Sequence, residues 1–324
     1  MSSDLVDVHD LKVYYRTAAG SARAVDGVSL SITRGEIVGI VGESGCGKST
    51  LATGMLRLTR PPCYVESGKV LFDGIDLMSL SREDMRKMRL KRFSWIPQGS
   101  MNSLNPIKRI GDQIRDGILA HEESGRADLE KRTRELVEMV GLPPETARMY
   151  PHELSGGMQQ RAVIAIAMSL RPQFVIADEP TTALDVVVQR AVLQFLASIR
   201  DDLGSSVMLI THDMAVTAET CDRLGVMYAG KLVEVGGVRD MFKDPLHPYT
   251  KALIEATPSL LGRKKLKMLK GVPPSLVNPP TGCRFKERCP EYNNEKCSDE
   301  EPTLRDAGSG RMVACHLWWG RSIA

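Results

Sequence analysis

Long apolar runs are missing from this 324-residue sequence. No stretch approaches the roughly 18–20 uncharged residues that a helix needs to span a bilayer. Residues 1–7 also lack the basic start and apolar core of a secretory signal peptide. We therefore expect a cytosolic protein whose part in any membrane process comes through partner chains.

An excess of charge of one sign is missing as well. The 43 basic and 40 acidic residues leave a formal net charge of +3. Composition therefore gives no case for a protein that binds nucleic acid or an anionic membrane surface. Hydrophobic residues make up 42% of the chain, enough for a sizeable core, and the length favours two domains over one.

Close cysteine pairs of the form Cys-x₂₋₄-Cys, which are typical of structural zinc sites, are also absent. Four of the seven cysteines nevertheless gather in the last 42 residues, with 5, 7 and 17 residues between them: Cys283, Cys289, Cys297 and Cys315. In a reducing cytosol such a group favours metal binding over disulfides. An iron–sulfur cluster, whose ligand spacing varies, a zinc ion and unliganded thiols are the three alternatives.

What the sequence does contain is a phosphate-binding pattern. Residues 42–50 fit G-x-x-x-x-G-K-[ST] at every fixed position, between an apolar run at 35–41 that reads as a buried strand and a helix-compatible segment at 51–56. The glycines let backbone N–H groups point at one phosphate chain, and the helix N-terminus adds partial positive charge. The alternative is a glycine-rich turn that happens to contain lysine, and the flanking strand and helix argue against it.

The pattern assigns roles within this phosphate loop. Lys48 reaches the β- and γ-phosphates, and the Ser49 hydroxyl binds Mg²⁺. The predicted nucleotide-binding residues of the loop are Gly42, Ser44, Gly45, Cys46, Gly47, Lys48, Ser49 and Thr50.

Two carboxylates end a later apolar strand. Residues 174–177 lead into Asp178, which we expect to hold Mg²⁺ through its water shell, and Glu179, which we expect to polarise the water that attacks the γ-phosphate. Acidic residues often end strands, so this pair alone is weak evidence of a catalytic site. The phosphate loop upstream makes the catalytic interpretation strong.

A second backbone anion site is predicted at Ser155-Gly156-Gly157, which leads into a helix. One chain has no second nucleotide to place there, so the natural ligand is the ATP of a partner subunit. The alternative is a simple helix cap, because serine is a favoured N-cap residue.

An α/β fold is predicted because apolar runs alternate with helical patterns. Residues 174–177 and 206–210 read as parallel core strands joined by a crossover helix over 186–199. A helical insertion is predicted at about 99–160, and a strand hairpin within the first 32 residues. A basic and then proline-rich segment after residue 257 predicts a boundary between domains 1–257 and 258–324.

Three further segments occur in chain order: Ile96-Pro97-Gln98, Thr182-Ala183-Leu184-Asp185 and Thr211-His212-Asp213. With the phosphate loop and residues 154–161, they resemble the Q-loop, D-loop, switch histidine and signature motif of the nucleotide-binding subunits of ABC transporters, over about residues 5–257. The resemblance implies a P-loop ABC nucleotide-binding domain with a RecA-like parallel sheet core, an antiparallel β subdomain and a helical signature subdomain.

The resemblance also implies site residues. Gln98 ligates Mg²⁺ or its water, together with Ser49 and Asp178, and His212 contacts the γ-phosphate. Tyr15 stacks on adenine, with Tyr14 as the alternative. In a head-to-tail dimer, four residues would contact the ATP of the other subunit: Ser155, Gly157, Gln160 and Asp185. Catalysis would depend on Glu179, His212 and Lys48.

Residues 103–106 and 247–253, and the segments 279–285 and 288–290 in the tail, resemble the ATPase subunits of oligopeptide and dipeptide permeases. Nickel importers and some oligosaccharide importers belong to the same family. Gly99 departs from the pattern, because many members carry an acidic residue there. Some dipeptide-type members have a [4Fe-4S] cluster in a similar tail, so the resemblance implies such a cluster on the four cysteines, with zinc as the alternative.

These observations predict the ATP-hydrolysing subunit of a binding-protein-dependent importer on the cytoplasmic face of the cell membrane. The expected partners are two transmembrane permease subunits, an extracytoplasmic substrate-binding protein and a paralogous ATPase subunit, without nucleic acid. Peptides are the expected cargo, and oligosaccharides or nickel are the alternatives. A non-transport ABC ATPase is the rival class, but the sequence has one cassette and no long heptad arms.

Overall fold

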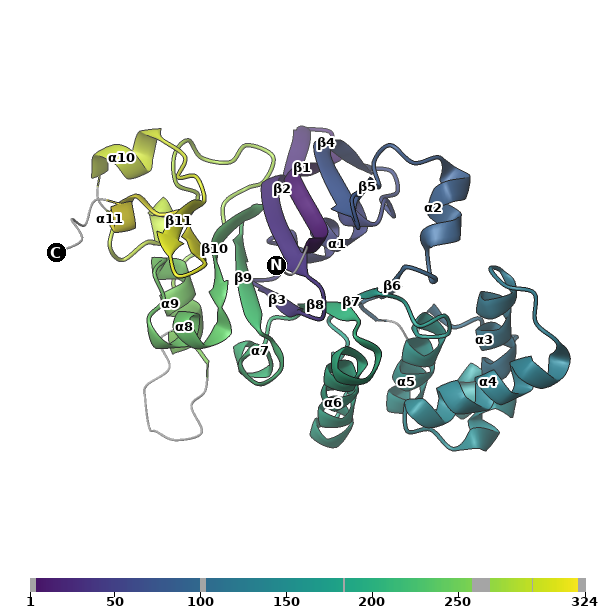
Figure 1. Ribbon diagram of the computed structural model, residues 1–324. Helices are drawn as coiled ribbons and strands as arrows, with labels where there is room; N and C mark the ends of the chain where they lie inside the picture. The colour runs from purple at the N-terminus through teal and green to yellow at the C-terminus, as the bar shows by residue number, and fades with distance from the viewer. Residues whose placement is uncertain (1–3, 100–102, 183, 258–268, 293, 320–324) are drawn as a thin grey trace. The chain divides into compact units, whose positions relative to one another are not determined.

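The computed structural model describes residues 4–99, 103–182, 184–257, 269–292 and 294–319 (Figure 1). The chain separates into two compact units. The first combines Met1–Thr33, Val38–Ser79 and Thr211–Ala324, and the second combines Arg34–Ile37 and Leu80–Ile210.

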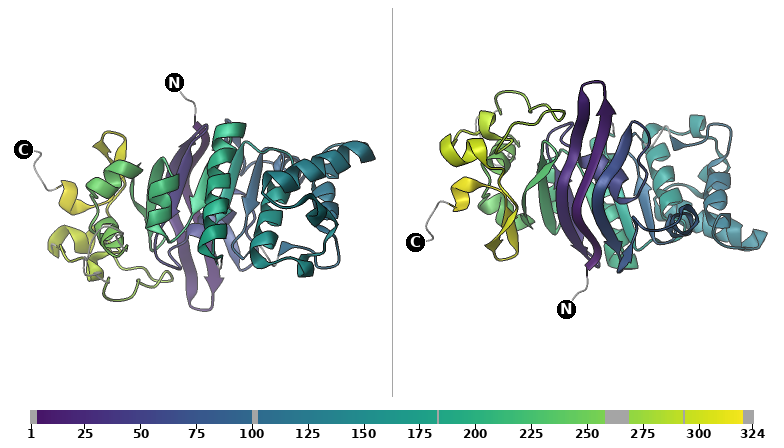
Figure 2. Two further views of the ribbon diagram at one scale, coloured as in Figure 1. Left: turned by 90° about the horizontal axis from the view of Figure 1, so that it is seen from below. Right: turned by 90° about the horizontal axis from the view of Figure 1, so that it is seen from above.

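The first unit contains a four-stranded antiparallel sheet with the strand order β2-β1-β4-β5. Its two long strands, β1 (Asp4–Thr17) and β2 (Gly20–Thr33), lie side by side as the predicted hairpin (Figure 2). β4 (Cys63–Phe72) and the short β5 (Ile75–Asp76) complete the sheet. Apolar residues recur along one face of β1, and that face is buried.

A second set of strands in this unit has the order β11-β12-β10-β9-β3. β3 (Ile37–Val41) is parallel to β9 (Arg223–Tyr228) and buried along its length, as its uninterrupted apolar sequence predicts. β10 (Lys231–Gly237) is antiparallel to β9, and two tail strands, β12 (Arg311–Val313) and β11 (Arg305–Gly308), follow. The cysteine-rich tail is thus joined to β10 by strand pairing.

Short helices complete the first unit. They are α1 (Lys48–Met55), α7 (Met214–Thr220), α8 (Val238–Lys243), α9 (Pro248–Glu255), the 3₁₀ turn Lys286–Arg288, α10 (Asn294–Asp299) and α11 (His316–Trp319). The predicted domain boundary at 257/258 remains a prediction, because residues 258–268 lie outside the described part of the chain.

The second unit contains the predicted parallel strands, in the order β8-β7-β6. These are β6 (Phe93–Ile96), β7 (Phe174–Asp178) and β8 (Ser206–Ile210), and α6 (Val186–Leu203) is the predicted crossover helix between the last two. β7 and β8 are fully buried, which explains their uninterrupted apolar sequences.

The predicted helical insertion is also present in the second unit. Its helices are α3 (Ile110–Leu119), α4 (Arg126–Met139) and α5 (Gly156–Ala167), which contact one another (Figure 1), with 3₁₀ turns at Pro144–Arg148 and Pro151–Glu153. The short α2 (Arg82–Met88) precedes β6. In the parts of the chain that are described, no helix is both long enough and apolar enough to cross a membrane.

Candidate nucleotide-binding site

The phosphate loop of the first unit has the tight curl that its sequence predicts. It connects β3 to α1, and Gly47, with φ of 109°, is the N-cap of that helix. A Cβ atom on Gly47 would lie 2.0 Å from the Ala24 carbonyl oxygen, and one on Gly42 would lie 2.2 Å from the Met227 carbonyl oxygen. Only glycine fits at these two positions, because a side chain would collide with the neighbouring backbone.

Lys48 lies inside this curl. Its side chain is buried, and its Nζ donates to the carbonyl oxygens of Gly42 at 2.7 Å and Glu43 at 3.1 Å. The loop thus holds the ammonium group against its own backbone carbonyls. The thiol of Cys46 is 3.8 Å from Nζ, and burial raises its pKa, so Cys46 is a neutral thiol at neutral pH.

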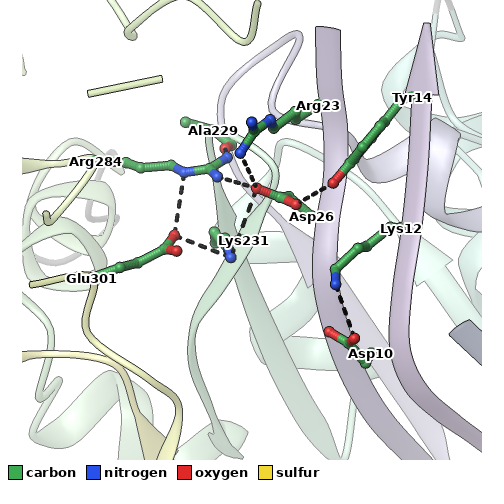
Figure 3. A network of polar contacts seen from close by, with 9 residues as sticks. All are labelled: Asp10, Lys12, Tyr14, Arg23, Asp26, Ala229, Lys231, Arg284 and Glu301. Atoms are coloured by element: carbon green, nitrogen blue, oxygen red, sulfur yellow. Dashed lines mark hydrogen bonds and ion pairs between the residues drawn. The ribbon is translucent and has the colours of Figure 1, made fainter. Parts of the chain in front are cut away.

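The two candidate adenine-stacking residues have different surroundings. The Tyr15 hydroxyl lies 3.1 Å from Thr50 Oγ1, in the first turn of α1. The Tyr14 hydroxyl instead donates to Asp26 at 2.6 Å and belongs to the network drawn in Figure 3. Burial and the Asp26 carboxylate raise the pKa of Tyr14. Tyr15 is therefore the tyrosine that lies against the phosphate-loop helix.

His212 also belongs to the first unit. It follows β8 in the chain and is exposed, between Thr211 and the N-cap residue of α7. That residue, Asp213, accepts from Ala215 N–H at 2.8 Å, and its own N–H donates to the Thr211 hydroxyl at 3.0 Å. These bonds fix the backbone on both sides of the histidine.

The second unit brings Gln98 and Glu179 together, although 81 positions separate them in the chain. Gln98 Nε2 donates to Glu179 Oε2 at 3.0 Å, and the Thr182 hydroxyl donates to the same oxygen at 3.0 Å. Asp178 is buried at the end of β7. Glu179 has φ of 47°, a costly conformation for a non-glycine residue that occurs most often at functional sites.

Thr182 is a partner that sequence reasoning missed. The sequence indicates Thr182 only as the first residue of the D-loop segment and does not predict its contact with the carboxylate. A hydroxyl three residues after Glu179, in the turn that follows β7, is a usable signal, because such side chains often bond back across the turn that ends a strand.

Two of the four residues predicted to contact the ATP of the other subunit, Ser155 and Asp185, cap helices. The Ser155 hydroxyl accepts from Met158 N–H at 3.4 Å at the start of α5, so the helix cap that the sequence left as an alternative is present. Asp185 caps α6 in the same way, accepting from Val187 and Val188 N–H at 3.0 and 2.9 Å. Gln160 is buried within α5.

Gly157 has a packing reason for lacking a side chain. A Cβ atom there would lie 2.8 Å from a methyl group of Val188. The start of α5 therefore lies close to the start of α6, within the second unit.

The four tail cysteines lie near one another. Cys283 N–H donates to the Cys297 carbonyl at 2.9 Å. Burial, and then the neighbouring thiols, raise the pKa of Cys283 to about 12 and that of Cys289 to about 11, while burial raises the pKa of Cys315. Among the residues that the structure describes, no group of three or more His, Cys, Asp or Glu side chains is arranged to hold a metal. The expected [4Fe-4S] cluster and its zinc alternative thus have no support in this arrangement.

Comparisons with known proteins identify the family of the chain. A family model described as "ABC transporter" matches residues 25–182, and one described as "Oligopeptide/dipeptide transporter, C-terminal region" matches residues 233–297. The oligopeptide transport ATP-binding protein OppD of Bacillus subtilis is 43% identical over 93% of this chain and 85% of its own length. The dipeptide transport ATP-binding protein DppD of Haemophilus influenzae is 41% identical, with 96% and 95% covered.

Solved structures give the same result for the fold. A dimeric ATP-binding cassette in a post-hydrolysis state with ADP and Pi matches with a TM-score of 0.66 and 28% identity, covering 72% of this chain and 99% of that one. CbiO1 of Clostridium perfringens matches with a TM-score of 0.64 and 25% identity, covering 74% and 91%. The chain therefore belongs to the family of ATP-hydrolysing, ATP-binding subunits of ABC transporters, and within it to the oligopeptide/dipeptide group.

Proposed function

We propose that this chain powers an importer of dipeptides or oligopeptides. The observation that carries the proposal is similarity over nearly the whole chain, including residues 233–297, to ATP-binding proteins named for oligopeptide or dipeptide transport. The C-terminal match carries the most weight, because a phosphate loop and a carboxylate pair serve ATP-driven transport of any cargo.

In the proposed reaction the first unit binds ATP. Lys48 and the loop N–H groups bind the β- and γ-phosphates and offset their charge. Tyr15 stacks on adenine, which its position beside Thr50 supports. His212 contacts the γ-phosphate.

Glu179 polarises the attacking water. The bonds from Gln98 and Thr182 to Oε2 fix the orientation of the carboxylate. An ionised carboxylate held in this way accepts a proton from the water as its oxygen bonds to the γ-phosphorus and the bond to the ADP oxygen breaks.

Mg²⁺ is expected with ATP, and the donor set fits it by chemistry. The Ser49 hydroxyl, the Gln98 amide oxygen and the Asp178 carboxylate, which is 1% exposed, are oxygen ligands of the kind that Mg²⁺ prefers. When bound, the ion supplies positive charge against the charge that develops on the phosphates.

The proposed transporter contains a second ATPase subunit. Ser155, Gly157, Gln160 and Asp185 would contact the nucleotide bound by that subunit, which we propose is a paralogue. Two transmembrane permease subunits and an extracytoplasmic binding protein are the other proposed partners, with this chain on the cytoplasmic face of the membrane.

Cargo class decides between this proposal and its alternatives. The test is ATP hydrolysis by the chain assembled with its membrane subunits and binding protein, with peptides, oligosaccharides or Ni²⁺ added in turn. We expect peptides alone to stimulate hydrolysis. Stimulation by an oligosaccharide or Ni²⁺ instead would contradict the peptide assignment, and robust hydrolysis that no cargo or membrane subunit alters would favour a non-transport ATPase.

No step is assigned to a metal on the tail cysteines, because the described thiols do not form a ligand set. The cluster implied by the family resemblance still has a direct test, which is iron, sulfide and zinc analysis of anaerobically purified full-length chain. The resemblance predicts stoichiometric iron and sulfide. Zinc without iron would show that the cysteines bind zinc and not an iron–sulfur cluster. The absence of both metals would contradict both the cluster and the zinc site.

A further inference from the structure

The loop residue Glu43 is held by the cysteine-rich tail. Its carboxylate forms two hydrogen bonds with the guanidinium of Arg288, from Nη1 at 2.7 Å and from Nη2 at 2.8 Å. The pair is separated by 245 positions in the chain, and both residues belong to the first unit. Such two-point pairing of arginine with a carboxylate is both strong and geometrically specific.

Arg288 is itself held in place by Lys270 and Tyr228. Its side chain is 5% exposed, and its Nε donates to the Lys270 carbonyl at 3.0 Å. Its Nη1 also lies 3.3 Å from the Tyr228 hydroxyl, and its guanidinium carbon lies 5.7 Å from the centre of the Tyr228 ring. A buried arginine with these partners has little freedom, so it can hold Glu43 in one position.

Glu43 connects this arginine to the catalytic lysine. The Glu43 carbonyl oxygen accepts from Lys48 Nζ at 3.1 Å, and from Cys46 N–H at 3.2 Å. On the other side of the same residue, Glu43 N–H donates to the Tyr249 hydroxyl at 3.0 Å. Glu43 therefore forms hydrogen bonds through its side chain, its backbone N–H and its backbone carbonyl.

An aromatic cluster supports these contacts. Tyr228, Tyr249 and Phe285 have ring centres 4.6–5.3 Å apart, and all three are almost fully buried. Phe285 comes from the tail, three residues before Arg288. The tail thus contributes to the packing beneath the loop as well as to the ion pair.

We propose that Arg288 is a positioning residue of the nucleotide site: through Glu43 it holds the backbone that orients Lys48, so the cysteine-rich tail sets how well ATP is bound and hydrolysed. Without Arg288, the Glu43 carboxylate loses both bonds, and the carbonyl beneath Lys48 is held less firmly. A displacement of about 1 Å in a positioned group can cost on the order of 100-fold in rate. The proposal rests on the proposed function only in requiring that ATP bind the loop.

The test is a double-mutant cycle in the full chain. We compare Arg288→Gln, Glu43→Gln, the double variant and Arg288→Lys, and we measure ATP affinity, KM for ATP, kcat and melting temperature. We expect each single Gln variant to raise KM for ATP by roughly tenfold or more. The double variant should be no worse than the worse single variant, because both remove one interaction. Arg288→Lys should recover part of the loss.

Arg284→Gln is the matched control. Arg284 is an equally buried tail arginine that binds Asp26 and donates to the Ala229 carbonyl at 2.6 Å, and none of its described hydrogen bonds goes to a phosphate-loop residue (Figure 3). We expect it to lower the melting temperature and leave KM for ATP within twofold of wild type. If Arg284→Gln and Arg288→Gln raise KM for ATP equally, any loss of tail packing impairs ATP binding and Arg288 has no specific role. The proposal is then wrong.

Two further outcomes would overturn the proposal. One is a folded Arg288→Gln chain with wild-type KM and kcat, and the other is additive losses in the double variant. Glu43→Gln leaves the tail intact, so it decides the matter if Arg288→Gln does not fold. ATP binding by the wild-type chain is measured first: failure there would contradict the proposed function, whereas failure of the cycle alone contradicts only the role of Arg288.

Discussion

Glu179→Gln should abolish most ATP hydrolysis while leaving ATP binding intact. Glutamine has the same shape as glutamate, and its side-chain oxygen can still accept from Gln98 and Thr182, which both donate to Oε2 at 3.0 Å. The amide cannot take a proton from the attacking water, and a general base contributes about 10²–10⁴-fold to rate. We therefore expect kcat to fall by at least about 100-fold.

Phosphate release gives kcat for this variant, and titration with ATP gives its affinity. Glu130→Gln is the matched control, because Glu130 is exposed on α4 and pairs only with Arg126, at 3.2 Å, among its described contacts. The control should hydrolyse ATP like wild type. Near-wild-type hydrolysis by purified, partner-free Glu179→Gln would exclude Glu179 as the catalytic base.

Lys48→Gln should lose both binding and turnover. The Lys48 ammonium is the buried positive charge inside the loop, and a hydrogen bond to a charged group contributes about 1.5–3 kcal/mol. The loss of this hydrogen bond corresponds to a roughly 10- to 100-fold weaker affinity for ATP. The chain should stay folded, since glutamine can still donate to one of the carbonyls that Nζ contacts, those of Gly42 and Glu43.

Equilibrium titration with ATP, with circular dichroism to check folding, measures this effect. Lys131→Gln serves as the control, because the Lys131 side chain is 76% exposed on α4, far from any phosphate-loop residue in sequence. A folded Lys48→Gln chain with unchanged affinity would show that the triphosphate does not bind at the loop. Comparison with Glu179→Gln then separates binding from chemistry.

Local patterns made the phosphate loop and the core strands predictable. Residues 42–50 form one contiguous loop whose glycines are required by the backbone itself, as the close approach of Gly47 to the Ala24 carbonyl demonstrates. β7 and β8 are buried on both faces, so their sequences are continuous apolar runs. The carboxylates at the end of β7 were found because they follow such a run.

Contacts between distant residues were not predictable in the same way. The bond between Gln98 and Glu179 and the ion pair between Glu43 and Arg288 leave no periodic signal, because each partner lies in a loop or a short turn. The tail strands β11 and β12 have four and three residues, too few for an alternating pattern.

Two predicted features show that one sequence pattern can be compatible with more than one local structure or role. The residues of Ser155-Gly156-Gly157 serve equally as a helix cap and as an anion site, so the sequence could not separate these uses, and the structure shows the cap. The group of four cysteines favoured a metal site in the sequence, but the proximity of the thiols alone does not fix the geometry that a metal needs.

ATP-dependent uptake of a labelled dipeptide tests the central claim most directly. The chain is assembled with its membrane subunits in vesicles, with ATP on the side of this chain and the binding protein and peptide on the other. We predict accumulation of the peptide with the wild-type chain and none with Glu179→Gln. Equal accumulation with both chains, or none with wild type while an oligosaccharide accumulates, would contradict an ATP-driven peptide importer.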